Sequence, residues 1–295
     1  MKKLSTVGAA IIPAAGLGTR LLSVTKEQPK EMLPLFSSEE NEVTLKPVMQ
    51  LVFEQLFACG CRRFFVIVGR GKRAIQDHFS PDYEFIRSLE LSGKVNQSRM
   101  LRKFYEMTEK SKIVFVNQPT PKGFGDSVLQ AEWLVIDKAF LVHAGDTCFI
   151  SSRHIPAMLA DLHSRNEADA TVALKKVADP RPYGVAEVTD RGKQTVRLRQ
   201  LVEKPARPRS KLAIMPLYVF NEKIFDAIRH TPPGKAGEIQ LTDAIQRLID
   251  EGLNVQGVKL RSDDIRLDVG TPQIYWDSLE KSHRHAVRLA GLEIG

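Results

Sequence analysis

The chain has 295 residues, of which 43% are hydrophobic and 26% are charged, and these proportions exclude a disordered or fibrous protein. Its length fits one large domain or two ordinary ones. With only 3 cysteines, a disulfide-stapled secreted scaffold is excluded and a cytoplasmic protein is indicated. Lysine and arginine outnumber the acidic residues by 43 to 35, and this positive excess suits an anionic partner without saying which one.

The start of the chain imitates a signal peptide, with a basic end at residues 1–3 and an apolar run over residues 7–15. This run leads directly into a glycine-rich segment, and cleavage would remove the strand that presents it. We therefore predict that the segment stays in the folded protein. No apolar run approaches the roughly 18 residues that a membrane helix needs, so we expect no membrane partner.

The first half alternates short apolar runs with amphipathic stretches, a pattern typical of a mostly parallel sheet covered by helices on both faces. We predict strands over residues 7–12, 64–68, 113–116 and 140–142, and helices over residues 47–57 and 127–136 and, more loosely, 83–105. In such sheets ligands bind beyond the carboxyl ends of the strands. The segments that follow residues 12, 116 and 142 are therefore the first candidates for a site.

After residue 169 the pattern changes to strand-like runs punctuated by prolines. We predict strands over residues 170–174, 184–188, 196–202 and 212–220, and helices over residues 224–228, 241–249 and from 272 onward. The polar segment 37–44 predicts an exposed loop or hairpin. Together the elements predict one α/β domain over residues 1–295, with a mixed, mostly parallel sheet and a small antiparallel part in its second half.

The strongest local pattern is a glycine-rich turn that follows the first predicted strand. The turn ends at Arg20. Glycines let backbone N–H groups approach phosphate oxygens closely, and the forked cation of Arg20 suits phosphate. A dinucleotide-binding loop would carry a third glycine where Leu21 stands, so NAD binding is disfavoured. Lys30, further along the chain, can supply a second cation.

Nine segments of the chain form a recognisable series. In chain order they are residues 16–20, 25–26, 29–34, 118–125, 145–146, 183–185, 202–205, 237–244 and 268–270. In type and order they resemble the signature of the sugar-1-phosphate nucleotidylyltransferases, and chance does not explain nine matches in one order. Within that family they are most similar to the bacterial uridylyltransferases that act on UTP and glucose 1-phosphate.

The resemblance implies a Rossmann-like nucleotide-diphospho-sugar transferase fold, with a nucleotide-binding half at about residues 1–150 and a sugar-binding half at about residues 151–295. It also implies a homo-oligomeric, Mg²⁺-dependent enzyme that converts UTP and glucose 1-phosphate into UDP-glucose and pyrophosphate. The attacking sugar phosphate is largely ionised near neutral pH, because its second pKa is about 6. Catalysis then depends on positioning the substrates and neutralising their crowded charge.

The same resemblance assigns roles to individual residues. The catalytic candidates are Arg20, Lys30, Asp146 and Lys204; the nucleotide-binding candidates are Ala15, Gly16, Gly18, Thr19, Glu31, Gln118 and Gly123; the sugar-phosphate candidates are Gly184, Glu203, Lys204 and Ile214; and the Mg²⁺ ligands are Asp146 and Asp268. Gln118 can both donate to and accept from a pyrimidine edge. Two carboxylates plus phosphate oxygens form a donor set that suits Mg²⁺.

The two aspartates each follow an apolar strand-like run, at residues 140–142 and 265–267. We expect parallel-sheet topology to bring these strand ends together at the ligand-binding edge. Because no basic residue adjoins either aspartate in the sequence, the carboxylates of Asp146 and Asp268 should repel one another unless a cation lies between them.

Simpler structural interpretations stand beside these roles. Asp146 could cap a helix, Asp268 could be a turn residue, and Lys30 could be a solvated surface lysine. Residues 238–243 fit the start of a helix, and we assign them a structural role. The two cysteines at 59 and 61 lack metal-binding partners and indicate packing.

Other functions stay open at this stage. Residues 268–272 look more like the thymidylyl and mannose-guanylyl branches, so a glucose-1-phosphate thymidylyltransferase or another UDP-sugar enzyme is the alternative. Basic residues at 62–63, 70, 72–73, 197 and 199 favour a nucleic-acid-binding hypothesis, but no aromatic-interleaved basic motif accompanies them, and we expect no nucleic-acid partner. A non-catalytic sugar-nucleotide sensor is disfavoured because both cations and both aspartates occur together.

Overall fold

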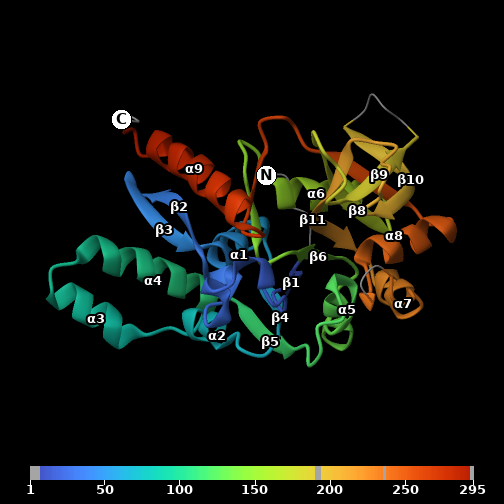
Figure 1. Cartoon of the computed structure of the whole chain (residues 1–295). Helices are drawn as coiled ribbons and strands as arrows, with labels where there is room; N and C mark the ends of the chain where they lie inside the picture. The colour runs from blue at the N-terminus through green and yellow to red at the C-terminus, as the bar shows by residue number, and fades with distance from the viewer. Residues whose placement is uncertain (1–6, 190–193, 235–236, 293–295) are drawn as a thin grey trace.

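The computed structural model describes residues 7–189, 194–234 and 237–292, so the basic residues 1–3 of the signal-like start lie outside the described chain. Its main sheet contains β1 (Ala9–Pro13), β4 (Arg63–Val68), β5 (Lys112–Asn117), β6 (Phe140–His143), β8 (Ala170–Lys176), β9 (Gly184–Val188), β10 (Thr195–Glu203), β11 (Leu212–Phe220) and β12 (Val255–Lys259). Their order is β5-β4-β1-β6-β11-β8-β12-β10-β9. Figure 1 shows the first-half strands beside those of the second half.

The predicted mixed α/β sheet is confirmed, and its two halves differ in strand direction. The strands β5, β4, β1 and β6 run parallel. In the second half β11 is antiparallel to β6, β8 and β9, and β10 is antiparallel to β9 and β12, while β8 and β12 are parallel. The antiparallel part is therefore larger than predicted, because β11 lies between β6 and β8 and runs against both.

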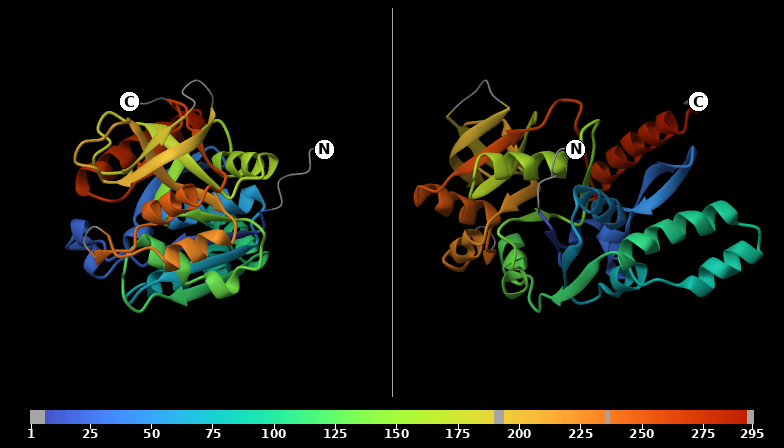
Figure 2. Two further views of the ribbon diagram at one scale, coloured as in Figure 1. Left: turned by 90° about the vertical axis from the view of Figure 1, so that its right-hand side faces the viewer. Right: turned by 180° about the vertical axis from the view of Figure 1, so that it is seen from behind.

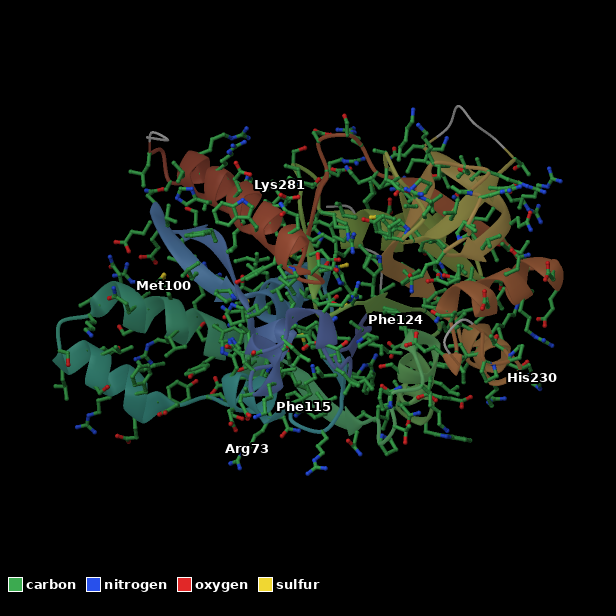
Figure 3. All side chains as sticks on the ribbon, viewed as in Figure 1. Arg73, Met100, Phe115, Phe124, His230 and Lys281 are labelled. Atoms are coloured by element: carbon green, nitrogen blue, oxygen red, sulfur yellow. The ribbon has the colours of Figure 1, made fainter. Side chains whose placement is uncertain are left out.

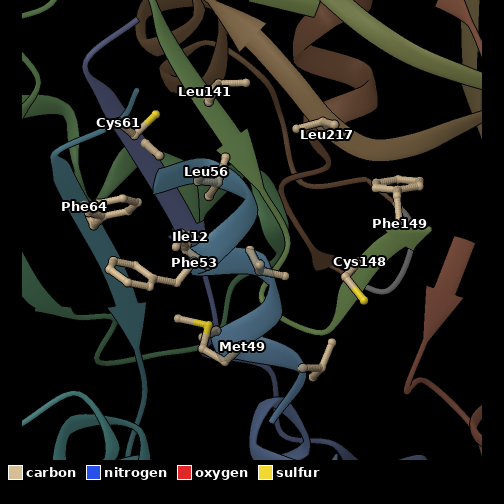
Figure 4. Packing of buried hydrophobic residues seen from close by; sticks show 14 of the residues in the cluster. Ile12, Met49, Phe53, Leu56, Cys61, Phe64, Leu141, Cys148, Phe149 and Leu217 are labelled. Atoms are coloured by element: carbon tan, nitrogen blue, oxygen red, sulfur yellow. The ribbon is translucent and has the colours of Figure 1, made fainter. Parts of the chain in front are cut away.

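Helices cover both faces of the sheet, as predicted. They are α1 (Val48–Cys59), α2 (Arg73–His78), α3 (Tyr83–Leu91), α4 (Val95–Glu109), α5 (Phe124–Leu129), α6 (Ile155–Arg165), α7 (Lys223–Arg229), α8 (Leu241–Asp250) and α9 (Pro272–Leu289). On one face, Ile12 of β1 packs in the cluster that holds Phe53 and Leu56 of α1 (Figure 4). The preceding residue, Ile11, belongs to the opposite cluster with residues of α5, α7 and α8. This alternation follows from the two-residue period of a strand.

Two further strand pairs lie outside the main sheet. β2 (Pro34–Glu39) and β3 (Glu42–Pro47) form the hairpin predicted around residues 37–44. Helix α9 lies along this hairpin (Figure 1), and the Tyr275 hydroxyl donates to the Pro34 carbonyl at 2.9 Å. β7 (Thr147–Ile150) pairs antiparallel with β13 (Ile265–Asp268) in a short ribbon. This ribbon pairs the strand that follows β6 with a strand near the end of the sequence.

Most predicted elements are present with small shifts of their ends. The segment 83–105 is two helices, α3 and α4, which are separated at Gly93 with a φ of +73° and project together from the rest of the chain (Figure 2). The helix expected over residues 127–136 instead begins at Phe124, ends at Leu129 and is followed by a 3₁₀ turn at Glu132–Leu134. The sequence did not predict α2, α6, β7 or β12. No helix in the described residues has the length and apolar character for crossing a membrane.

Candidate active site

A cleft of about 830 Å³ opens at the carboxyl ends of β1, β5 and β6, where the sheet topology predicted a ligand site. All of the candidate residues from the sequence line it: Ala15, Gly16, Gly18, Thr19, Arg20, Lys30, Glu31, Gln118, Gly123, Asp146, Gly184, Glu203, Lys204, Ile214 and Asp268. Residues far apart in the sequence, and from both halves of the chain, thus converge on one place.

The glycine-rich turn after β1 forms one wall of the cleft. Gly18 has a φ of +67°, and the Thr25 hydroxyl donates to its carbonyl at 2.8 Å, which holds the turn. A Cβ on Gly16 would lie 3.6 Å from Cε and 3.7 Å from Nζ of Lys30, so the ammonium group lies against the turn. Arg20 is exposed and forms no ion pair within the described residues. Its guanidinium is therefore available to an anion.

Lys30 and Asp146 form an ion pair in the cleft, with side-chain exposures of 14% and 20%. Burial alone would lower the pKa of Lys30, but the nearby carboxylates, first Asp146 and then Glu31, outweigh it and raise this pKa. Burial would likewise raise the pKa of Asp146, but Lys30 and then Arg266 lower it to about 2. Both groups are thus charged at neutral pH, and Lys30 is not a solvated surface lysine.

Asp268 lies close to Asp146, but a different element from the predicted one brings them together. The Thr147 hydroxyl is 3.2 Å from Asp146 Oδ1 and 3.3 Å from Asp268 Oδ2. Thr147 and Asp268 are paired residues of the β7–β13 ribbon, outside the main sheet. The expectation of two parallel strand ends was therefore wrong, because the chain leaves β6 at His143 and turns into an antiparallel ribbon.

A basic residue that the sequence analysis missed pairs with the second aspartate. Arg266 forms an ion pair with Asp268, and its guanidinium lies 5.3 Å from the centroid of the Tyr183 ring. Contrary to our expectation, the two carboxylates are not unpaired, since Lys30 pairs with Asp146 and Arg266 with Asp268. Their repulsion is reduced but not removed, because Asp146 adds to the effect of burial in raising the pKa of Asp268. Burial still raises the pKa of Asp268, although Arg266 opposes this. The sequence could have predicted the pairing of Arg266 with Asp268, because residues two apart on a strand point to the same side.

Gln118 lines the cleft and is only 4% exposed. Its backbone N–H donates to the Val68 carbonyl at 2.8 Å, and its side-chain Nε2 donates to Asp126 Oδ2 at 2.6 Å. Asp126 stands in the first turn of α5 and was not among the predicted residues. Phe124, which Figure 3 labels at the start of this helix, has its ring centroid 6.3 Å from that of Tyr218. The start of α5 thus contacts β11 in the second half of the chain.

Gly123 lines the cleft and is also packed closely against protein. Its φ is +107°, and a Cβ there would lie 2.8 Å from the Ile239 carbonyl oxygen and 2.9 Å from Glu238 Cβ. The Ile239 N–H in turn donates to the Lys122 carbonyl at 2.8 Å. The loop before α5 is therefore fixed to the segment before α8. That segment does start a helix, as predicted, but its residues also line the cleft.

The sugar-side candidates form a tight group around one carboxylate. The Thr242 hydroxyl donates to Glu203 Oε2 at 2.7 Å. A Cβ on Gly184 would lie 2.8 Å from Thr242 Oγ1, 2.9 Å from Ile214 Cδ1 and 3.0 Å from Glu203 Oε2, so any side chain there would displace this group. Lys204, with a φ of +43°, places its Nζ 3.3 Å from Glu203 Oε1. Thr242 was not predicted, because we assigned residues 238–243 to structure alone.

Glu31 is almost fully buried and pairs with Lys72 at 2.7 Å. Burial raises the pKa of Glu31, while Lys72 and Lys30 oppose the increase. Lys72 stands at the start of α2, an element that the sequence did not predict. The pair therefore ties α2 to the 3₁₀ turn Lys30–Met32 that presents Lys30.

The residues assigned to packing do not form a metal centre in the part of the chain that the structure describes. Cys59, Cys61 and Cys148 are buried and unpaired. No group of three or more His, Cys, Asp or Glu side chains among the described residues could hold a metal ion. Cys59 and Cys61 lie in the hydrophobic core cluster, which supports their interpretation as packing residues.

A family model described as nucleotidyl transferase matches residues 9–285. This chain belongs to that family. The prediction of a nucleotidyltransferase enzyme is therefore confirmed, as is the fold expected from the motif series.

Individual relatives agree with the family assignment. A protein of Methanocaldococcus jannaschii is 37% identical over 265 residues, which cover 88% of each chain. A Staphylococcus epidermidis protein named UTP–glucose-1-phosphate uridylyltransferase is 35% identical and covers 84% of this chain and 82% of its own length. A solved UDP-glucose pyrophosphorylase complexed with UDP-glucose has a TM-score of 0.80 at 27% identity, with 95% of this chain and 99% of that chain covered. The similarity to uridylyltransferases that the motifs predicted is confirmed.

Proposed function

We propose that this chain transfers a uridylyl group from UTP to glucose 1-phosphate in an Mg²⁺-dependent reaction that gives UDP-glucose and pyrophosphate. The observation that carries the proposal is the meeting of Arg20, Lys30, Asp146 and Asp268 with the Gly184–Glu203–Lys204 group in one cleft. The similar protein named UTP–glucose-1-phosphate uridylyltransferase and the similar pyrophosphorylase that binds UDP-glucose support the choice of substrates.

The reaction requires the protein to neutralise the negative charge of the substrate phosphates rather than to transfer a proton. An ionised oxygen of the sugar phosphate forms a bond to the α-phosphorus, and the bond from that phosphorus to pyrophosphate breaks. Arg20 and Lys30 would bind the triphosphate and offset its negative charge as the leaving group departs. Lys204 would hold the sugar phosphate in line for attack, while Glu203 accepts hydrogen bonds from sugar hydroxyls.

Asp146 and Asp268 fit an Mg²⁺ ion by the chemistry of their donors. Their carboxylates share Thr147 as a neighbour, at 3.2 and 3.3 Å, and two carboxylates are what such an ion takes from a protein when phosphates supply further oxygens. When bound, Mg²⁺ would supply positive charge to the phosphate groups. Because the described residues offer no larger cluster of metal-binding side chains, the nucleotide itself would complete the ligand set.

The two halves of the chain would divide the substrates between them. Residues up to about 150 would bind the nucleotide, through Ala15, Gly16, Gly18, Thr19, Glu31, Gln118 and Gly123, and the remainder would bind the sugar phosphate, through Gly184, Glu203, Lys204 and Ile214. We further propose a cytoplasmic enzyme, which suits three unpaired cysteines, and a homo-oligomer, by family resemblance.

A panel of nucleotides and sugar 1-phosphates tests the proposal. Pyrophosphate release should be fastest, by kcat/KM, with UTP and glucose 1-phosphate. A preference for dTTP would favour the thymidylyltransferase alternative, which the sequence Asp268-Val269-Gly270-Thr271-Pro272 suggests. Absence of pyrophosphate release with every pair would contradict nucleotidyl transfer to a sugar phosphate. Lys30→Ala should reduce kcat roughly 100-fold or more, and the exposed Lys138→Ala is its matched control.

A further inference from the structure

The amide of Gln118 is held by a carboxylate behind it. Its Nε2 lies 2.6 Å from Asp126 Oδ2 and 3.5 Å from the Gly123 carbonyl oxygen. Gln118 and Asp126 are 4% and 8% exposed. Gln118 lines the cleft, whereas Asp126 does not. Asp126 is therefore placed to act on a cleft residue from the side away from a ligand.

The chemistry of these neighbours decides which end of the amide faces them. A carboxylate and a carbonyl oxygen can only accept hydrogen bonds, so the donor nitrogen Nε2 must point toward Asp126 and Gly123. Without such neighbours the last torsion of a glutamine side chain has two nearly equivalent positions. Here the Nε2 end is fixed, and Oε1 must take the other position. No described residue donates a hydrogen bond to Oε1 of Gln118.

We propose that Asp126 is a positioning residue that orients the Gln118 amide so that Oε1 accepts the imide N3–H of a pyrimidine base. The ligand class is a nucleoside triphosphate with uracil or thymine, both of which carry this N3–H. Cytosine presents an acceptor at N3, so Oε1 would face a second acceptor there. This inference rests on the proposed function, because it takes the nucleotide to lie against Gln118.

A purely structural role for Asp126 is the competing explanation. An acidic side chain in the first turn of a helix is stabilised by the unpaired N–H groups of that turn, and Asp126 stands in the first turn of α5. If Asp126 has only that role, its loss should lower the stability of the protein and change kcat/KM for all nucleotides by the same factor. The positioning role affects the ratio between nucleotides, because it acts through the direction of one amide.

The first experiment compares UTP with CTP in Asp126→Asn. An asparagine at this position can either donate to or accept from Gln118, so both amide orientations become available. We expect the UTP-to-CTP ratio of kcat/KM to fall roughly tenfold or more, since an unpaired buried polar group costs about a factor of ten in affinity. The UTP-to-dTTP ratio should stay unchanged, because uracil and thymine share N3–H.

A second pair of variants keeps the test independent of how well that protein folds. Gln118→Glu places two carboxylates against each other and should lose the preference for UTP over CTP. Combining Gln118→Glu with Asp126→Asn restores a donor–acceptor pair, in which the new asparagine amide donates to one glutamate oxygen and the other oxygen faces the base. The double variant should regain the preference. Asp82→Asn is the matched control and should leave the UTP-to-CTP ratio unchanged. An asparagine can still cap α3, and residue 82 does not line the cleft.

Calorimetric binding of UTP and CTP supplies a readout that does not need turnover. A fall of the UTP-to-CTP affinity ratio in Asp126→Asn, with recovery in the double variant, supports the proposal. An unchanged ratio accompanied by a lower Tm would overturn it and leave Asp126 as a structural residue, with the proposed function intact. Wild-type protein that binds UTP and CTP equally would overturn the inference and the assignment of Gln118 to the base together. UTP preference without pyrophosphate release from sugar phosphates would contradict the proposed function alone.

Discussion

At the scale of single residues, the two aspartates of the cleft differ in how the fold treats their charge. Burial opposes the charge on Asp146, yet Lys30 and Arg266 lower its pKa to about 2. Burial raises the pKa of Asp268, and Arg266 only partly offsets this. The fold therefore stabilises the ionised form of Asp146 and disfavours the ionised form of Asp268.

The substitutions Asp146→Asn and Asp268→Asn should separate these two effects. We expect Asp146→Asn to lower the free energy of unfolding by about 2 kcal/mol, because the buried Lys30 ammonium loses its partner. Asp268→Asn should leave it unchanged or slightly higher. Both variants should lose most turnover, with partial recovery at raised Mg²⁺. Urea unfolding without substrate and turnover across a series of Mg²⁺ concentrations measure the two quantities.

The surface variant Glu40→Gln is the control for this pair, since its ion pair with Arg99 is exposed and contributes little. Near-normal turnover of either asparagine variant at limiting Mg²⁺ would show that the aspartate concerned is structural. A gain of stability in Asp146→Asn would contradict the ion-pair argument.

Gly184 offers a residue-scale test of the sugar side. In Gly184→Ala the new methyl group would lie 2.8–3.0 Å from Thr242, Ile214 and Glu203, so the Glu203 carboxylate must move. We expect the KM for glucose 1-phosphate to rise roughly tenfold or more, while the KM for UTP stays nearly unchanged. Gly252→Ala is the control, because it has a φ of +79° with no atom within 4 Å and should cost stability alone. Equal effects on both KM values would count against the division of the cleft.

The residues that the sequence could predict were those within contiguous motifs, such as Gly16, Asp146 and Glu203. Arg266 and Thr242 were missed although they lie beside predicted residues, because a motif does not say which neighbours its side chains meet. Asp126 could not have been found from sequence alone. Its contact with Gln118 depends on how the intervening loop folds back, which is set by contacts with the distant segment before α8.

At the scale of elements, the β2–β3 hairpin shows local strain that can be removed. Its two turn residues, Glu40 and Asn41, have φ values of +50° and +64°, the left-handed region in which Asn-Gly is the preferred pair. The double substitution Glu40→Asn/Asn41→Gly should raise the free energy of unfolding by about 1 kcal/mol, measured as a higher urea midpoint. The same pair placed inside α3, as Ser88→Asn/Leu89→Gly, should lower it. A lower midpoint for the hairpin variant would mean that the Arg99 ion pair outweighs the backbone effect.

The elements that the sequence analysis missed share a physical cause. In β12, Gly257 interrupts the strand pattern, but a Cβ there would overlap Leu174 Cδ1, so the glycine is a packing requirement. In α6, Pro156 imitates a helix breaker but lies in the first turn, where proline is tolerated. The short β7 is stabilised by β13, which lies more than a hundred residues later. Tertiary contacts, rather than local propensity, decide these elements.

At the scale of the whole molecule, the class of sheet followed from the alternation of strands and helices, but its strand directions did not. Residues 7–142 carry the strand–helix alternation that produces parallel neighbours. The position of β11 between β6 and β8 depends on pairing partners that are 36 to 80 residues away in sequence, and no local pattern contains that information. The cleft inherits this long-range order, since its two sides come from different parts of the sheet.

Three histidines, the buried His143 and His163 and the half-buried His78, make the stability of the whole molecule depend on pH. Burial lowers the pKa values of His78, His143 and His163 to about 4, whereas the unfolded chain holds such groups at their ordinary value of about 6.5. Between these limits the unfolded chain binds more protons at these sites. The stability that the neutral rings contribute is therefore complete above about pH 6.5 and is lost as the pH falls toward 4.

His143 tests this argument most directly, because it is fully buried and its Nε2 has no hydrogen-bond partner in the described residues. We expect His143→Asn to be less stable at pH 7, since a smaller side chain leaves a gap. Its free energy of unfolding should nevertheless fall less steeply between pH 6.5 and 4.5, by up to about 1.4 kcal/mol per pH unit, as measured by urea unfolding at several pH values. The exposed His230→Asn should keep the steep slope. An unchanged slope in His143→Asn would show that this ring does not gain a proton when the chain unfolds in acid.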